Sequence, residues 1–157
     1  GMTRRVMIST AMIEKPRLVI ADEPTPGLHQ KAAKSAMEHF RELADMGAGV
    51  LIITHDLELA LETADRVLVF YAGYTLEDAK TEDFSKEETL RHPYTKALWR
   101  AIPKNGFQYI DGVQPYVKDM PSGCPFAPRC SRCSEKCHGE IPYREVNGGY
   151  VRCVYDS

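Results

Sequence analysis

Residues 18–23 constrain the fold more than any other part of this chain. Four apolar residues, LVIA, run directly into the adjacent carboxylates Asp22 and Glu23, and the turn-forming sequence Pro-Thr-Pro-Gly follows. A continuous apolar run bounded by turn residues is typical of a strand buried on both faces, as in a parallel sheet. The two acids would then stand at the carboxyl end of a buried strand, where open α/β sheets bind their ligands.

A second apolar run repeats this arrangement further along the chain. Residues 50–54 read VLIIT and lead directly into His55 and Asp56. Between the two runs, apolar residues recur at steps of three and four over residues 33–44, which predicts an amphipathic helix. Because strands that alternate with helices build parallel sheets with right-handed crossovers, we predict an α/β fold.

The remaining elements divide the chain into two regions. A helix is predicted over residues 2–14, a short helix capped by Asp56, strands over residues 66–71 and 74–77, and a helix over 94–102 that starts beside His92. From residue 105 onward Gly, Pro and Cys dominate and helical periodicity ends. We therefore predict a core over residues 1–104 and a coil region over residues 105–157, which has too little apolar material for its own core and would need a staple.

Charge and hydropathy exclude several classes of function. The 20 basic and 22 acidic side chains give a formal net charge of -2. Nucleic acid is excluded as a partner because no basic footprint is present. No apolar run approaches the length of a membrane span, so a soluble, cytoplasmic chain is expected.

The polar ends of the two apolar runs suggest phosphate chemistry. One carboxylate of the Asp22–Glu23 pair can hold Mg²⁺ near a nucleotide phosphate while its neighbour orients an attacking water. His55 would stand at the same sheet edge, a short distance from Glu23. The alternatives are two solvated acids at a strand end and a histidine with a structural role.

All five cysteines lie in the last third of the chain, at positions 124, 130, 133, 137 and 153. An odd number in so short a segment favours a metal or cluster over disulfides. The spacing C-x₅-C-x₂-C-x₃-C-x₁₅-C suits four thiolates around one centre, and zinc fits such a site as well as an iron-sulfur cluster does. Free thiols or disulfides are the remaining alternative.

Several motifs together resemble one protein family. Residues 18–25, LVIADEPT, resemble the Walker B segment of ATP-binding cassette (ABC) ATPases, and residues 51–56, LIITHD, resemble their switch-histidine segment. Residues 1–8 are similar to the end of the signature motif and the helix after it. RHPYT at residues 91–95 and CPFAPRC at residues 124–130 are similar to the carboxyl-terminal region of the oligopeptide, dipeptide and nickel importer subfamily. The resemblance implies part of a three-layer P-loop NTPase core followed by a cysteine-stapled coil region.

The same resemblance implies roles for individual residues. Asp22 would serve Mg²⁺, Glu23 would be the catalytic carboxylate and His55 the γ-phosphate switch. Gly1 would be the last signature glycine, which contacts the nucleotide of the partner subunit, unless it is a cloning remnant. The family pattern implies a [4Fe-4S] cluster on Cys124, Cys130, Cys137 and Cys153, with Cys133 as an extra thiol that spacing alone does not set apart from the ligands.

Two positions depart from the family pattern: His29 stands where aspartate is usual, and Arg4 where glutamine is common. These departures bear on the contacts that cross the dimer. The implied partners are a second ATPase subunit and membrane permease subunits, which would place the chain at the inner face of the cell membrane.

The phosphate-binding sequence G-x-x-x-x-G-K-[ST], called Walker A, has no match in the 157 residues. Without its backbone nest and lysine, the chain alone is expected to bind ATP weakly or not at all and not to hydrolyse it. ATP and Mg²⁺ would require a partner that carries Walker A. The missing strand would also leave apolar sheet edges open, which favours self-association. The alternative function is a non-catalytic iron-sulfur or zinc-binding fragment that pairs with a complete ATPase subunit.

Overall fold

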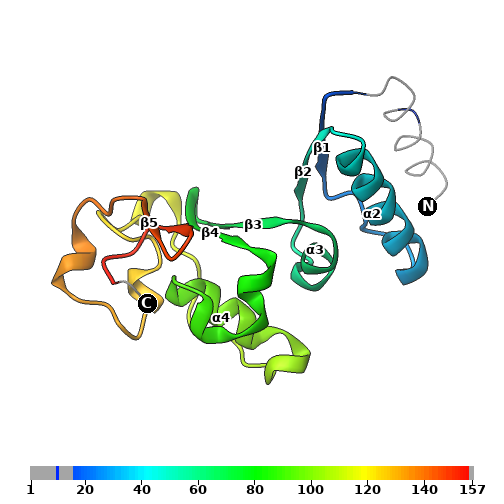
Figure 1. The fold of residues 1–157 in the computed structure, drawn as a ribbon. Helices are drawn as coiled ribbons and strands as arrows, with labels where there is room; N and C mark the ends of the chain where they lie inside the picture. The colour runs from blue at the N-terminus through cyan, green and yellow to red at the C-terminus, as the bar shows by residue number, and fades with distance from the viewer. Residues whose placement is uncertain (1–9, 11–15, 156–157) are drawn as a thin grey trace. The chain divides into compact units, whose positions relative to one another are not determined.

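The two apolar runs form a pair of parallel strands. The structure is a computed structural model that describes residue 10 and residues 16–155. β1 (Leu18–Asp22) pairs in parallel with β2 (Gly49–Ile53), and Asp22 lies opposite the last residue of β2. α2 (Gln30–Asp45) connects the strands and runs alongside them (Figure 1). The predicted strands and helix are confirmed here, whereas Gly1 and nearly all of the predicted first helix lie outside the described residues.

Helix α2 covers one face of this sheet with its apolar stripe. Met37, Phe40 and Leu43 recur at steps of three, and they are buried together with Val19 of β1. Gly47 follows the helix with φ of 95°, a left-handed conformation that glycine adopts without strain. The alternation of side chains along β1 and β2 therefore decides which residues reach this small core.

The other face of the β1–β2 sheet is open. Its large apolar side chains are 47 to 62% exposed, and they are Leu18, Ile20, Leu51 and Ile53. The prediction that the first strand is buried on both faces is wrong for the described residues, because α2 covers only the opposite face. Parallel sheets are normally covered on both faces, so within the described residues this sheet lacks one of the layers that its composition requires.

The short helix after β2 begins where the sequence predicts. Asp56 precedes α3 (Leu57–Thr63), and its side chain accepts a hydrogen bond from the Leu59 amide at 3.0 Å. This N-cap satisfies one of the free amides of the first helical turn. Across the described stretches, no helix is long and apolar enough to cross a membrane.

The next two strands form an antiparallel hairpin. β3 (Arg66–Tyr71) and β4 (Tyr74–Lys80) are joined by Ala72 and Gly73, which both have positive φ, at 48° and 85°. Two such residues match the twist of a two-residue hairpin turn. Both strands were predicted, but the turn forces them to be antiparallel, so they do not extend a parallel sheet.

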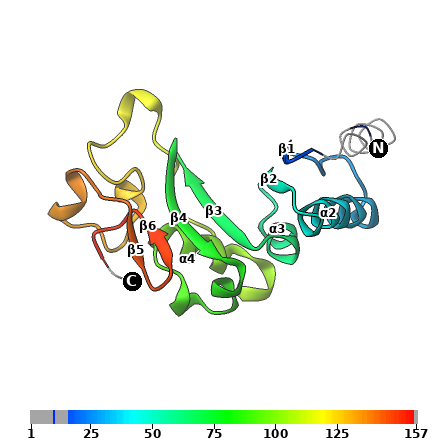
Figure 2. The same cartoon turned by 45° about the horizontal axis from the view of Figure 1, so that its top comes forward.

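A second hairpin near the end of the chain completes this sheet. β5 (Arg144–Val146) and β6 (Gly149–Val151) are joined by Asn147 and Gly148, a pair that strongly favours a two-residue hairpin turn. The strand order is β3-β4-β6-β5 (Figure 2). Sequence analysis predicted coil for this region, and the hairpin corrects that prediction.

The second unit also contains the helix α4 (Pro93–Ala101) and several short helical turns. α4 confirms the helix predicted beside His92, and Pro93 stands at its first position. The other segments are short 3₁₀ turns, which are Thr81–Ser85, Glu87–Thr89, Pro103–Asn105, Val117–Asp119, Ala127–Arg129 and Glu135–His138. Regular structure is therefore sparse after residue 104, as the composition predicts.

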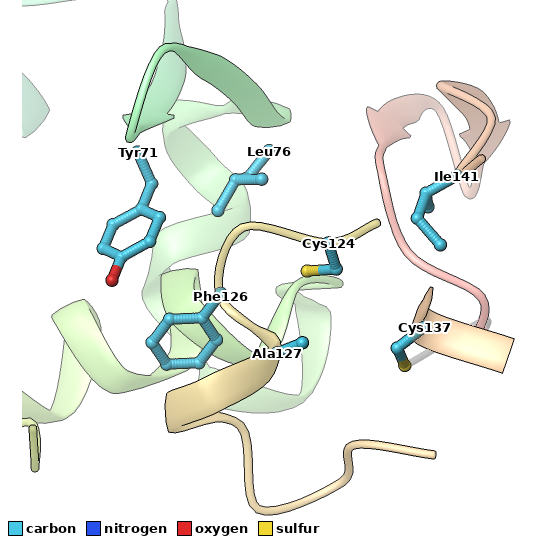
Figure 3. Packing of buried hydrophobic residues seen from close by; sticks show 7 residues of the cluster. All are labelled: Tyr71, Leu76, Cys124, Phe126, Ala127, Cys137 and Ile141. Carbon is cyan, nitrogen blue, oxygen red and sulfur yellow. The ribbon is translucent and has the colours of Figure 1, made fainter. Parts of the chain in front are cut away.

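The chain divides into two compact units, Gly1–Ala64 and Asp65–Ser157. Within the second unit the cysteine-rich segment packs against the β3–β4 hairpin, because Phe126 and Ile141 share a buried cluster with Tyr71 and Leu76 (Figure 3). The tail thus borrows a core from residues before position 104. The domain boundary near residue 104 was predicted from composition alone, and it stays a prediction.

A buried ion pair joins the parts of the second unit. The Glu77 carboxylate is fully buried and accepts hydrogen bonds from the Arg91 amide at 2.9 Å and the His92 amide at 2.7 Å. The Arg91 guanidinium lies 3.3 Å from the same carboxylate and donates to the backbone carbonyls of Val146 and Asn147, both at 2.6 Å. One side-chain pair therefore connects β4, the start of α4 and the β5–β6 turn.

Glu77→Gln is expected to lower the free energy of unfolding of the second unit by about 1–3 kcal/mol, because its amide nitrogen cannot accept one of the buried hydrogen bonds and the Arg91 guanidinium keeps only Asp83, at 2.9 Å, as a carboxylate partner. Trp99 is the single tryptophan and lies in α4, so its fluorescence in urea follows this unit. The control Glu88→Gln removes an exposed carboxylate nearby and should change the free energy by less than about 0.5 kcal/mol. Identical unfolding curves for the two variants would contradict this role of Glu77.

Candidate functional site

The chain leaves β1 through a sharp turn at Glu23. Glu23 has φ of 43°, in the left-handed region that a residue with a long side chain rarely adopts. Its amide donates to the Ile53 carbonyl at 2.8 Å, which continues the ladder between β1 and β2 past the end of β1. Such strained residues cluster at functional sites, and this one turns its carboxylate toward the end of β2.

The Glu23 carboxylate meets the imidazole of His55. Glu23 Oε1 and His55 Nδ1 are 2.8 Å apart, although 32 positions separate the two residues in sequence. The hydrogen bond that the His55 ring donates to Glu23, and then the charge of Glu23, raise the pKa of His55 above the ordinary value of 6.5. The predicted proximity of these side chains is confirmed, whereas their catalytic roles stay predictions.

One oxygen of Glu23 has no partner within the described part of the chain. The His55 side chain is 81% exposed and that of Glu23 is 37% exposed, but the Oε2 atom of Glu23 is shielded from solvent and accepts no hydrogen bond. A shielded carboxylate oxygen without a donor is costly. Asp22 is exposed beside it. This corner therefore offers unsatisfied acceptor oxygens of the kind that water and Mg²⁺ seek.

An open hollow of about 670 Å³ lies beside His55. It is bounded by residues from the Pro-Gly turn and the sides of α2 and α3, and its charged residues are of both signs: Lys31, Lys34, Asp56, Glu58 and Glu62. Mixed charge is a poor cradle for a polyphosphate, which needs converging amides and cations. The hollow therefore does not replace the missing Walker A loop.

His29 has a structural use at the position where the resemblance leads us to expect an aspartate. Its Nδ1 accepts a hydrogen bond from the Ala32 amide at 3.2 Å and thereby caps α2. Aspartate is among the preferred residues for the same task. The substitution thus keeps the helix start while it removes a negative charge.

Four of the five cysteines line one small cavity in the second unit. Cys124, Cys130, Cys137 and Cys153 surround a space of about 10 Å³, together with His92 and several apolar residues. In Figure 3, Cys124 belongs to the loop that also carries Phe126 and Ala127, and Cys137 comes from a different segment. Cys133 is exposed and does not line the cavity. The structure thus separates the four cysteines of the implied ligand set from the fifth.

The loop around Cys124 approaches its neighbour closely. The Cys124 amide donates to the Cys137 carbonyl at 2.9 Å. A Cβ atom at Gly123 would lie 2.0 Å from that same carbonyl oxygen, so only glycine fits before Cys124. This contact keeps the two cysteines on a common cavity.

The cysteine thiols are not arranged as metal ligands in this structure. All five cysteines are free, and no group of three or more His, Cys, Asp or Glu side chains among the described residues is arranged to hold a metal ion. Burial raises the pKa of Cys124 to about 11, and it also raises the pKa values of Cys130 and Cys153. The expected staple stays a prediction, and apolar packing also holds the described tail against the rest of the second unit.

His92 is a residue of this cavity that sequence reasoning treated only as a helix start. Its Nδ1 accepts the Tyr94 amide hydrogen at 3.0 Å, which confirms the capping role. The ring is also buried, and its Nε2 lies 3.8 Å from Cys124 Sγ. Burial lowers the pKa of His92 to about 3. The distance of 32 positions between His92 and Cys124 hid this contact from the sequence pattern.

Comparison with known proteins identifies the family. Residues 76–137 match the family model described as the oligopeptide/dipeptide transporter, C-terminal region. A dipeptide transport ATP-binding protein of Haemophilus influenzae is 38% identical over 98% of this chain, and an oligopeptide transport ATP-binding protein of Bacillus subtilis is also 38% identical over 98%. The chain belongs to the family of oligopeptide and dipeptide transport ATP-binding proteins.

The match to this family is partial in length. The chain covers 48% of each of those two relatives and 47% of an oligopeptide transport ATP-binding protein of Escherichia coli, to which it is 35% identical. It therefore spans about half the length of these family members. A solved structure described as the ATP binding subunit of an ABC transporter matches 54% of this chain and 35% of its own, with 33% identity and a TM-score of 0.49.

In this family member, Glu23→Gln is expected to lower the pKa of His55 toward 6.5, because it removes the carboxylate that stabilises the charged ring. Since the pKa is raised in the folded chain, the contact stabilises the fold below pH 6.5 and is lost as the pH rises through the raised value. An NMR titration of the His55 ring measures this. Glu38→Gln, on the exposed side of α2, is the control, and equal His55 pKa values in both variants would contradict the expectation.

Proposed function

We propose that this chain is the carboxyl-terminal part of an ATP-binding subunit that energises an ABC importer of oligopeptides or dipeptides. The observation that carries the proposal is the 2.8 Å contact between Glu23 and His55 at one sheet edge, in a chain of this family. It joins the ends of two strands whose sequences resemble the Walker B and switch-histidine segments. Nickel is the other substrate of the subfamily named by the resemblance, and transport of peptides is favoured by the names of the relatives.

The three polar side chains at this edge divide the work of phosphoryl transfer. Bound ATP and Mg²⁺ would supply the transferable phosphoryl group and the charge that neutralises it. Asp22 is the exposed carboxylate available to the hydrated ion, and Glu23 has a free oxygen to orient a water. His55 holds the other oxygen of Glu23 and so fixes the direction of its carboxylate. A γ-phosphate would compete for the His55 ring, which is the physical basis for its proposed role as a switch.

The phosphate cradle has to come from residues outside these 157. The open face of the β1–β2 sheet supports this, because its four exposed apolar side chains need a covering layer. The relatives are about twice as long as this chain, so their unmatched half has a length suited to that layer. The competing possibility is that the chain associates with a second copy of itself through the open edges of β2 and β3.

The full assembly would include more than one subunit. A second ATPase subunit would provide the facing nucleotide site, and permease subunits would place the protein at the inner face of the cell membrane. Gly1 would contribute to the facing site. These partners follow from the family and stay proposals for this chain.

A second function is favoured by the cysteine cavity. We propose that Cys124, Cys130, Cys137 and Cys153 bind an iron-sulfur cluster, with zinc as the competing metal. The four sulfurs share one cavity, and the Cys124 amide donates to the Cys137 carbonyl, so the donor set fits a thiophilic centre even though its present geometry is not a metal site. Metal binding would require the sulfurs to be deprotonated and drawn together. In the alternative reading of the chain, this site is its own activity and a complete ATPase subunit is its partner.

ATP hydrolysis is expected only when the missing half is supplied. The chain alone should show no ATPase activity, and adding the part of the Haemophilus influenzae relative that it does not match should restore it. Glu23→Gln should then lower the rate by about 10²–10⁴-fold, the range for a positioned acid or base. Glu38→Gln serves as the control.

Activity of the chain alone that disappears in Glu23→Gln would contradict the need for a partner. Sedimentation of the same samples distinguishes self-association through the strand edges from binding of the missing half. A monomer at high concentration without the partner would contradict self-association, and failure of the two halves to combine would contradict the covering layer.

Metal binding is expected to depend on the four cysteines that line the cavity and not on Cys133. After anaerobic reconstitution with ferrous iron and sulfide, single serine variants at positions 124, 130, 137 and 153 should lose bound metal, because each removes a thiolate ligand. Cys133→Ser should retain it, since its sulfur lies outside the cavity. Iron, sulfide and zinc analysis measures the outcome. Equal loss in Cys133→Ser, or no metal in any variant, would contradict the assignment.

A further inference from the structure

His92 occupies a position between the core network and the cysteine cavity. It is only 1% exposed, and its amide donates to Glu77 Oε2 at 2.7 Å. Its ring lines the cavity and packs against Phe126, with ring centroids 6.1 Å apart. Both the backbone and the ring of His92 are therefore held by buried neighbours.

The tautomer of His92 follows from its hydrogen bond to Tyr94. A backbone N–H can only donate, so the ring Nδ1 that lies 3.0 Å from the Tyr94 amide must carry a lone pair. No carboxylate touches the buried ring, which is neutral. The one ring proton is therefore on Nε2.

This proton points at a sulfur. His92 Nε2 and Cys124 Sγ are 3.8 Å apart, a distance at which an N–H donates to sulfur, and the contact is buried. The sulfurs of Cys130 and Cys153 are instead held by backbone hydrogen bonds, from Arg132 and from Val154 and Tyr155. Among the described cysteines, Cys124 is thus distinguished by a fixed imidazole donor.

We propose that His92 is a positioning residue of the cysteine site, whose Nε2–H donates to Cys124 Sγ, holds that sulfur in the cavity and would tune the affinity and reduction potential of a metal centre bound there. The inference rests on the proposed metal binding by the four cysteines. His92 acts through Cys124 and is not itself a ligand. Hydrogen bonds to ligand sulfurs set reduction potentials, and partners behind the ligands typically change metal affinity by about 10–100-fold.

The geometry of His92 can be tested without metal. Long-range ¹⁵N NMR of the metal-free chain is expected to show the His92 proton on Nε2. A proton on Nδ1 would overturn the inference, because the Tyr94 amide and the ring would then not share a hydrogen bond and Nε2 would have no proton to give.

The function is tested with His92→Asn. The asparagine oxygen can still accept from the Tyr94 amide as an N-cap, but its side chain is too short to reach Cys124. The variant is expected to bind Zn²⁺, measured by chelator competition, about 10–100-fold more weakly than the natural chain. After reconstitution with iron and sulfide, its reduction potential should shift to more negative values, since the added electron loses a hydrogen bond. Trp99 fluorescence in urea checks that the fold is kept.

His138→Asn is the matched control, because His138 adjoins Cys137 but is exposed. It should leave affinity and potential unchanged. Unchanged values in His92→Asn, or a His92 nitrogen bound directly to the metal in pulsed EPR, would overturn the inference while the cysteine site stands. Failure of the natural chain to bind either metal would instead refute the cysteine site, and the role of His92 with it.

Discussion

The second unit depends on one buried carboxylate. Glu77 accepts two backbone amides, those of Arg91 and His92, and it also balances the charge of the Arg91 guanidinium. A buried charge is tolerated only when it is paired and its hydrogen bonds are satisfied, so this pair fixes the segment around it. The consequence extends to the cysteines, because the residue held beside Arg91 is the histidine whose ring reaches Cys124. A stability element and a candidate metal site thus share one backbone segment.

Most individual elements could be predicted from the sequence because their causes are local. The apolar runs of β1 and β2, the stripe of α2, the Asp56 cap and Pro93 at the start of α4 each act within one turn or strand. Pairing between strands was harder. The direction of β3 and β4 depends on two residues with positive φ, Ala72 and Gly73, and alanine gives no signal of that conformation. The Asn-Gly pair of the β5–β6 turn favours a hairpin, but the Gly, Pro and Cys content of the surrounding segment favours coil.

The candidate site at the sheet edge was more predictable than the cysteine cavity. Parallel strands bring their carboxyl ends to one edge, so the approach of Glu23 and His55 follows from the order of elements. The cavity instead depends on contacts between segments without regular structure, such as the approach of Gly123 to the Cys137 carbonyl. The spacing of the cysteines does not distinguish Cys133 from the four candidate ligands, and only the family resemblance does. The position of Cys133 outside the shared cavity supports this distinction. The contact between His92 and Cys124 could not be predicted from the sequence. The local pattern accounts only for Nδ1 of the ring, which caps α4, whereas Nε2 contacts a sulfur 32 positions away.

The uncovered face of the β1–β2 sheet gives the two units different thermodynamics. The second unit buries a core of its own and an ion pair within it. The first unit keeps four large apolar side chains in water, and anything that covers them lowers its free energy by mass action. Its apparent stability should therefore rise with the concentration of whatever binds that face.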